Sequence, residues 1–281
     1  MTQVETHTYE YLRQEKKFPG VWCAGCGIGI VMGALIRAID DLGLDKDSVA
    51  VISGIGCTGR MPVYLDFNTM HTTHGRALAF ATGLKVARPE MHVIAVMGDG
   101  DALAIGGNHF IHAARRNVGI TSIIVNNQIY GMTGGQASPT TPTNMLATTA
   151  PYGNLDQPFP ITDLAIAAGA SFVARSTVYH VTELNRFIEK ALKTPGFAVV
   201  EAVSYCHTTY GRINRLGGAV AMMRAIREHS TTQAAYQRKP AEERDPQAIV
   251  RGIFYDEAEK PEYSALYQQL VDKEMQEADA S

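Results

Sequence analysis

Two short apolar runs in the middle of the chain are each followed by a polar residue that could bind a metal ion. The first run, 93–97, leads into Gly98-Asp99-Gly100-Asp101, and the second, 122–125, leads into Asn126-Asn127. Both runs are rich in β-branched residues and too short for helices, so they predict buried parallel strands. Residues 102–117 between them predict a crossover helix. Asp99 and Asn127 are therefore expected at the carboxyl ends of two strands.

This placement has a chemical use, because ligands of open α/β sheets bind outside the carboxyl ends of the strands. The glycines beside Asp99 let the backbone approach a ligand closely, and the N-terminus of the following helix favours a phosphate. Mg²⁺ commonly takes one or two protein oxygens and completes its shell from a bound diphosphate and water. We therefore predict Asp99, Asn127 and the backbone carbonyl of Ile129 as Mg²⁺ ligands. The alternative is a helix cap at Asp99 or Asp101 and a simple turn after the second strand.

The four cysteines form a second set of residues that could do chemistry. Cys23 and Cys26 form a Cys-x-x-Cys on a glycine-rich turn, whereas Cys57 and Cys206 each follow a predicted strand. Four thiolates can hold a [4Fe–4S] cluster or a structural Zn²⁺. One close pair joined by two distant single cysteines favours the cluster. Zinc, or four unrelated buried thiols, are the alternatives. In a parallel sheet, Cys57 and Cys206 would share one edge with Asp99 and Asn127.

The remaining pattern positions these residues in a single α/β domain. Predicted strands alternate with helices along the chain, which is typical of a doubly wound parallel sheet. The five strands are expected at 49–55, 93–98, 122–127, 172–175 and 197–203, with helices near 28–42, 76–88, 102–117, 162–170 and 181–193. The glycine-, threonine- and proline-rich stretch 131–160 is predicted to be irregular. We divide the chain into an extended arm (1–20), the α/β domain (21–210) and a helical tail (211–281) packed on the domain or a partner.

Composition excludes several classes of protein. The 281 residues are 46% hydrophobic, enough for a large core, and the net charge of −3 gives no reason to expect a nucleic-acid partner. No apolar stretch is long enough to span a membrane, and the first residues lack the apolar core of a signal peptide. Four unevenly spaced cysteines fit a metal site in a cytoplasmic protein better than a disulfide framework.

Taken together, the motifs resemble the β subunit of the 2-oxoacid:ferredoxin oxidoreductases, over roughly residues 20–210. The residues that carry the resemblance are Trp22-Cys23-Ala24-Gly25-Cys26-Gly27, Gly54-Ile55-Gly56-Cys57, His74-Gly75-Arg76-Ala77, Gly98-Asp99-Gly100-Asp101, Ile105-Gly106-Gly107-Asn108-His109, the run from Asn126 to Gln136, and Ser138-Pro139-Thr140. No motif of the family is found after about residue 211.

The resemblance implies a thiamine-diphosphate-binding fold and a redox reaction. A 2-oxo acid would be decarboxylated on thiamine diphosphate with Mg²⁺, electrons would leave singly through a [4Fe–4S] cluster to ferredoxin, and coenzyme A would take the acyl group. The cofactor-binding residues implied are Cys23, Cys26, Cys57, Cys206, Gly56, Gly98, Asp99, Gly100, Asp101, Asn127 and Thr133.

The resemblance also implies a divided active site. In this family the pyrimidine-binding domain, with the glutamate that activates thiamine, belongs to an α subunit. We therefore expect an α partner, an (αβ)₂ assembly and ferredoxin as electron acceptor.

Two further residues are expected near the substrate. Arg60 lies where the family tends to place a basic residue facing the substrate carboxylates, and a guanidinium suits bidentate carboxylate recognition. His74 is expected to face thiamine diphosphate or substrate. With the sequence from Met132 to Gln136, Arg60 favours 2-oxoglutarate over pyruvate or branched 2-oxo acids. A structural ion pair is the alternative for Arg60, and a non-oxidative thiamine-dependent decarboxylase or a diphosphate-sensing module is the alternative for the whole chain.

Overall fold

The computed structural model describes residues 7–15 and 19–279. The arm expected over 1–20 therefore lies partly outside the described residues, at 1–6 and 16–18. Its described part forms a 3-10 helix, η1 (His7–Tyr11), and then runs along residues 64–69 of the same chain. Leu12 makes a β-bridge with Leu65, and the Arg13 guanidinium donates to the Thr69 hydroxyl at 2.6 Å. This part of the arm packs on its own domain.

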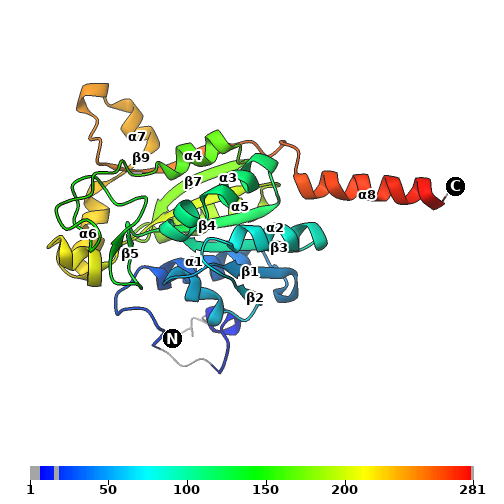
Figure 1. The fold of residues 1–281 in the computed structure, drawn as a ribbon, viewed down its shortest axis with the longest axis horizontal. Helices are drawn as coiled ribbons and strands as arrows, with labels where there is room; N and C mark the ends of the chain where they lie inside the picture. Colours follow the sequence, from blue (N-terminus) through cyan, green and yellow to red (C-terminus); the bar gives the residue numbers. More distant parts are fainter. Residues whose placement is uncertain (1–6, 16–18, 280–281) are drawn as a thin grey trace, which may run out of the picture.

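An eight-stranded sheet forms the centre of the molecule (Figure 1). The strand order is β2-β1-β3-β4-β8-β7-β10-β9, and every pair is parallel except β7 with β10. This confirms the doubly wound parallel class. The strands are β1 (Val49–Ser53), β2 (Asn68–His71), β3 (His92–Gly98), β4 (Ile120–Asn126), β7 (Phe172–Thr177), β8 (Ala198–Val203), β9 (Ser230–Thr232) and β10 (Ile249–Asp256). A separate hairpin pairs β5 (Ile129–Tyr130) with β6 (Gln136–Ala137).

Helices cover both faces of the sheet, because successive side chains of each strand point to opposite faces. Val49 and Val51 of β1 pack in one core with α1 (Ile28–Asp41) and α5 (Val181–Lys193). Ala50 and Ile52 pack in the other core with α2 (Ala77–Ala87), α3 (Gly107–Arg116) and α4 (Ile161–Ala168). The central strands are buried on both sides, which explains their continuous apolar runs.

The structure contains strands that the sequence pattern did not predict. Polar Asn68–His71, expected within or beside a loop, forms the edge strand β2, which has no apolar alternation because it is largely exposed. β9 and β10 come from the tail, which was expected to be helical. The helix expected over 102–117 is also divided, since a π-helical turn, η4 (Asp101–Ile105), precedes α3.

The rest of the tail is helical and ends in a projecting helix. After α6 (Ala219–His229), α7 (Gln233–Arg238) and the 3-10 helix η6 (Ala241–Glu243), α8 (Tyr263–Asp279) extends away from the sheet (Figure 1). Its start is fixed by the Glu262 carboxylate, which accepts hydrogen bonds from the backbone N–H groups of Gly119 at 2.6 Å and Ser264 at 2.8 Å. No helix among the described residues is long and apolar enough to cross a bilayer.

A buried ion pair behind the strand ends gives a test of the fold. Glu201 on β8 is 2% exposed and accepts from Arg175 on β7 at 2.7 Å and from the Asn126 amide at 2.8 Å. Arg175→Met would leave the Glu201 carboxylate without its counter-charge, so we expect a loss of about 3 kcal/mol in the free energy of unfolding by urea. The control Arg88→Met breaks an exposed pair with Glu90 and should cost less than about 1 kcal/mol. Equal losses in the free energy of unfolding of the two variants would contradict the role of Arg175 as the counter-charge of buried Glu201.

Candidate active site

Four neighbouring parallel strands end at one edge of the sheet, and each leads into an expected site residue. β1, β3, β4 and β8 lie side by side in that order. Cys57 follows β1, Asp99 follows β3, Asn127 follows β4 and Cys206 follows β8. The topology thus brings together residues separated by up to 149 positions in the sequence (57 to 206).

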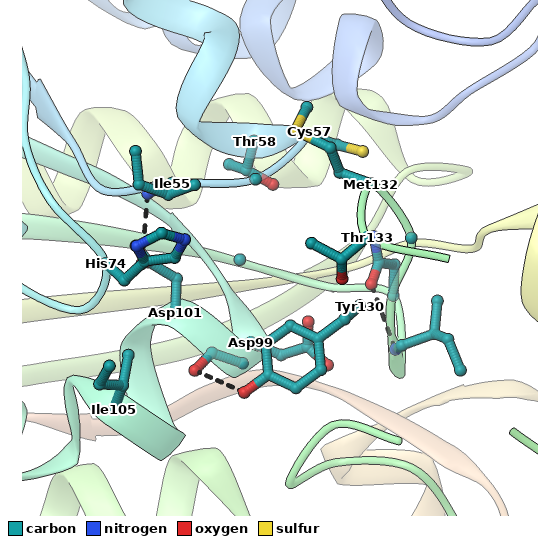
Figure 2. Close-up of a pocket in the computed structure, with 16 residues that line it drawn as sticks. Ile55, Cys57, Thr58, His74, Asp99, Asp101, Ile105, Tyr130, Met132 and Thr133 are labelled. Carbon is teal, nitrogen blue, oxygen red and sulfur yellow. Dashed lines mark hydrogen bonds between the residues drawn. The ribbon is translucent and has the colours of Figure 1, made fainter. Parts of the chain in front are cut away.

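A cavity opens at this edge (Figure 2). Figure 2 shows side chains from several segments around it, with the Tyr130 ring beside Asp99 and with Cys57 and Met132 on another side. Most of the expected site residues line the cavity, namely Gly56, Cys57, His74, Gly98, Asp99, Gly100, Asp101, Asn127, Ile129 and Thr133. Cys23, Cys26 and Cys206 are not part of its lining.

Asp99 carries the features of a cation ligand. Its side chain is 2% exposed, and one carboxylate oxygen accepts hydrogen bonds from the hydroxyls of Ser138, at 2.6 Å, and Thr140. Burial raises the pKa of Asp99 above its usual range, and the two hydroxyls partly oppose this effect. A buried carboxylate with no cationic partner is unfavourable in its charged form. A bound cation would remove that penalty, so Asp99 fits Mg²⁺.

Asn127 lies next to Asp99, because β3 and β4 pair with Gly98 opposite Val125. Its side chain is 9% exposed, and its amide oxygen accepts weakly from the Ile129 backbone N–H at 3.4 Å. Ile129 begins the β5–β6 hairpin, which fixes the backbone of this loop. A carboxylate, an amide oxygen and a nearby carbonyl are all oxygen donors of the kind Mg²⁺ prefers. This donor set fits the ion.

Asp101 joins two loops of the cavity wall. Its Oδ1 accepts from the backbone N–H of Gly75 at 2.7 Å and of Ile55 at 3.2 Å, while Oδ2 is buried without a hydrogen-bond partner among the described residues. The carboxylate lies so close to Gly54 that a Cβ there would be 1.9 Å from Oδ2. Asp101 thereby sets the position of the loop that carries exposed His74, which faces the cavity (Figure 2).

Close packing against the Tyr130 ring explains why a glycine stands at position 100. A hydrogen-bonded turn holds Thr133, the threonine expected at the site. A Cβ on Gly100 would lie 2.2 Å from the Tyr130 ring, whose hydroxyl donates to the Gly100 carbonyl at 3.2 Å. Thr133 donates to the Gln136 side-chain oxygen at 2.6 Å, and the Gln136 amide donates back to the Thr133 carbonyl at 2.9 Å. The exposed Thr133 hydroxyl therefore faces the cavity from a turn with a defined shape.

The four cysteines come together beside this cavity. A Cβ built on Gly131 would lie 3.2 Å from Cys206 Sγ and 3.8 Å from Cys57 Sγ, so both sulfurs contact the loop that carries Thr133. The Thr208 hydroxyl lies 3.6 Å from Cys23 Sγ and 3.7 Å from Cys206 Sγ. Burial raises the pKa of Cys26 to about 11, and the neighbouring thiols of the other three cysteines add to the increase.

Hydrogen bonds that do not involve sulfur hold the Cys-x-x-Cys turn in place. The Trp22 indole donates to the Cys57 carbonyl at 2.8 Å, and the Tyr205 hydroxyl donates to the Gly25 carbonyl at 2.7 Å. These bonds tie the turn to the loops of the two distant cysteines.

The donor set fits a four-iron cluster. Four thiols from a glycine-rich region, three of them half-buried and Cys23 exposed, match the usual ligands of such a cluster. Within the described part of the chain, no three His, Cys, Asp or Glu side chains are arranged around a single metal ion. A cluster has no such requirement, because each thiolate binds a different iron.

The contact of Gly131 with two thiols gives a second prediction. Gly131→Val would place a branched side chain against Cys206 and Cys57, so the iron content of the purified protein should fall several-fold. Gly107→Ala is the control, because a Cβ at Gly107 meets nothing within 4 Å. Iron content unchanged in Gly131→Val would show that this loop does not need to approach the sulfurs.

Arg60 is an expected site residue that lies neither in the cavity lining nor in the group of four cysteines. It is exposed on the 3-10 helix η3 (Thr58–Val63) and makes no ion pair among the described residues. Four further residues of the site had no predicted role: Ser138 and Thr140, which donate to Asp99, and Trp22 and Tyr205, which hold the Cys-x-x-Cys turn. Ser138 and Thr140 lie in the stretch 131–160, which is rich in glycine, threonine and proline. That composition is the feature of the sequence that could have pointed to them.

The fold and the site place the chain in the class of thiamine diphosphate enzymes. Residues 54–202 match the family described as thiamine pyrophosphate enzyme, C-terminal TPP binding domain. The 2-oxoglutarate synthase subunit KorB of Methanothermobacter marburgensis is 48% identical over 93% of this chain and 91% of its own length. The corresponding subunit of Archaeoglobus fulgidus is 57% identical over 71% of this chain and 74% of its own length. The chain therefore belongs to the family of 2-oxoacid:ferredoxin oxidoreductase β subunits, among those named 2-oxoglutarate synthase subunit KorB.

A solved structure supports this assignment. The 2-oxoglutarate:ferredoxin oxidoreductase of Magnetococcus marinus, with 2-oxoglutarate, coenzyme A and succinyl-CoA bound, superimposes with a TM-score of 0.83 at 31% identity. The superposition covers 97% of this chain and 92% of that chain. The similarity therefore includes the tail after residue 211, for which the sequence analysis found no motif.

Proposed function

We propose that this chain is the β subunit of a 2-oxoglutarate:ferredoxin oxidoreductase. It converts 2-oxoglutarate and coenzyme A to succinyl-CoA and CO₂, or the reverse, and passes electrons to ferredoxin. The names of the 2-oxoglutarate synthase relatives and the ligands of the Magnetococcus structure support the substrate and the product. The name of that structure, a 2-oxoglutarate:ferredoxin oxidoreductase, supports ferredoxin as the electron acceptor.

One observation carries the proposal: the thiols and the buried carboxylate are at the same edge of the sheet. The loop from Gly131 to Thr133 faces the cavity at Thr133 and contacts two sulfurs at Gly131. A decarboxylase without redox chemistry has no need of thiols at this position. A cofactor and a cluster held on two sides of one short loop suit the export of electrons.

The residues of this chain would bind two groups, the diphosphate cofactor with its Mg²⁺ and the [4Fe–4S] cluster. Asp99, Asn127 and the Ile129 carbonyl would hold Mg²⁺, and Thr133 with the glycine-lined backbone would hold the diphosphate. Cys23, Cys26, Cys57 and Cys206 would hold the [4Fe–4S] cluster. Thiamine diphosphate supplies an electron sink for decarboxylation. The chain orients it, and Asp101 sets the loop from which His74 faces the substrate.

An α subunit is expected to complete the site. Relatives are named as subunits, including the 2-oxoacid:ferredoxin oxidoreductase subunit beta of Saccharolobus solfataricus, which is 44% identical over 66% of this chain. Such a partner would bring the pyrimidine-binding domain to the cavity mouth. We propose an (αβ)₂ assembly, in which the α subunit covers the strand-end edge of the sheet.

The test is to purify the chain without oxygen, alone and with its α partner. About four irons per chain with broad absorption near 400 nm is expected of a [4Fe–4S] cluster. The assembly should then reduce ferredoxin only when 2-oxoglutarate and coenzyme A are both present. Zinc in a colourless protein, or turnover without an electron acceptor, would contradict the proposal.

Substitution of Arg60 tests whether 2-oxoglutarate is the substrate. Although Arg60 is exposed outside the cavity lining, its guanidinium would pair with the second carboxylate of 2-oxoglutarate, which pyruvate lacks. Arg60→Met should therefore lower kcat/KM for 2-oxoglutarate by about 100-fold, as expected for loss of a charge-assisted bond of about 3 kcal/mol, and change that for pyruvate little. Arg37→Met on α1 is the control. Equal losses on both substrates would make Arg60 structural.

A further inference from the structure

Two adjacent threonines direct their hydroxyls at the sulfur of Cys206. They lie in the π-helical turn η5 (His207–Gly211), which follows that cysteine directly. The Thr209 hydroxyl is 2.7 Å from Cys206 Sγ, and the Thr208 hydroxyl is 3.7 Å from Cys206 Sγ and 3.6 Å from Cys23 Sγ. Such turns are often found at functional sites.

The donors are distributed unevenly over the thiols. Cys206 lies within hydrogen-bond distance of both hydroxyls, whereas Cys23 lies within that distance of the Thr208 hydroxyl alone. Neither Cys26 nor Cys57 has a hydroxyl partner among the described residues. Among the described residues, Cys206 is therefore the sulfur with the largest set of hydroxyl donors.

These hydroxyls have a defined role once the sulfur is a thiolate bound to iron. A ligating thiolate has no proton to give, so each threonine hydroxyl must be the donor. Hydrogen bonds to sulfur stabilise the more negative, reduced form of a cluster, and they are one of the factors that set its reduction potential. The bond from Thr209 should count most, because it is the shortest.

We propose that the hydroxyls of Thr208 and Thr209 raise the reduction potential of the cluster by hydrogen bonding to Cys206 and Cys23. They are positioning residues, because they would act through the cluster and are not part of the cavity lining. The inference rests on the proposed function, because it requires that the four cysteines hold a cluster. It adds which residues of this chain set how readily that cluster accepts an electron.

The experiment is a redox titration of the αβ assembly, followed by the electron paramagnetic resonance signal of the reduced cluster. Thr209→Val keeps the shape of the side chain and removes the donor, whereas Thr209→Ser keeps the donor. At a solution potential near the wild-type midpoint, Thr209→Val should lower the ratio of reduced to oxidised cluster by about tenfold, which is 59 mV for one electron. Thr209→Ser should stay close to the wild type.

Two further variants complete the design. Thr208→Val, at an exposed position that tolerates the change, should shift the ratio in the same direction by a smaller factor. Thr82→Val is the control, because the Thr82 hydroxyl donates to the Leu78 carbonyl within α2, away from the cysteines. If Thr209→Val does not assemble, the comparison of Thr208→Val with the wild type decides alone.

The outcomes separate this inference from the proposed function. A wild-type protein without iron and sulfide would remove the proposed function, and the inference with it. A cluster whose potential is the same in the wild type, Thr209→Val and Thr208→Val would overturn the inference and leave the proposed function intact. An equal shift in Thr209→Ser and Thr209→Val would assign the effect to packing, which also overturns it.

Discussion

Asp99→Asn is expected to abolish the binding of Mg²⁺ and thiamine diphosphate while leaving the fold intact. The amide has the same shape and can still accept from Ser138 and Thr140, but it has no charge to offer a divalent cation. We expect at least a 100-fold loss in affinity, since even a change in the groups that orient a metal ligand costs about 10- to 100-fold. Burial disfavours the charged form of Asp99. The cofactor-free variant should therefore be as stable as the wild type or more stable.

The two effects of Asp99→Asn have opposite signs, which makes the test sharp. Thiamine diphosphate content and Mg²⁺-dependent thermal stabilisation should be lost, while iron content and the melting temperature of the cofactor-free protein should not fall. Asp47→Asn changes the net charge equally at an exposed position and should leave every readout unchanged. Retained cofactor binding in Asp99→Asn would show that Asp99 is not a ligand of Mg²⁺.

Cys206→Ala is expected to have the second large effect, loss of the [4Fe–4S] cluster and of succinyl-CoA formation. It removes one of four thiols and leaves the donors of the η5 turn without an acceptor. The proposed Mg²⁺ ligands follow other strands, and the Cys-x-x-Cys turn is held by Trp22 and Tyr205. Thiamine diphosphate should therefore still bind.

Iron, sulfide and the visible spectrum measure this outcome. Ser204→Ala is the matched control, because it removes a buried hydroxyl without a partner among the described residues, two positions before the cysteine. The control should keep about four irons per chain, the content of one [4Fe–4S] cluster. Cys206→Ala with the same iron content and absorption would contradict the four-cysteine assignment.

The sequence could predict which residues meet, because parallel strands share a carboxyl edge. Cys57, Asp99, Asn127 and Cys206 each follow an apolar run that reads as a strand, and the structure places β1, β3, β4 and β8 side by side. The alternation of strands and helices then determined the class of fold. For these four residues, the local sequence pattern was enough to predict that they lie at the same edge of the sheet.

Other parts of the site have no local pattern. The bonds from Trp22 to Cys57 and from Tyr205 to Gly25 join residues 35 and 180 positions apart, so only the folded chain reveals them. β2 is polar because it lies at an exposed edge, and β10 is identified by its antiparallel pairing with β7. The π-helical turn after Asp101 looks like ordinary helix in the sequence. In each case tertiary contacts decide the local conformation.

The order in which the four thiols appear along the chain has a consequence for biosynthesis. Two are made within the first 26 residues, but Cys206 follows β8, which must be synthesised and paired with β4 before the set is complete. Insertion of the proposed cluster would therefore come late in biosynthesis, because it must wait for almost the whole domain. A chain interrupted before β8 would present three reactive thiols and no closed site, and would be vulnerable to oxidation at that stage.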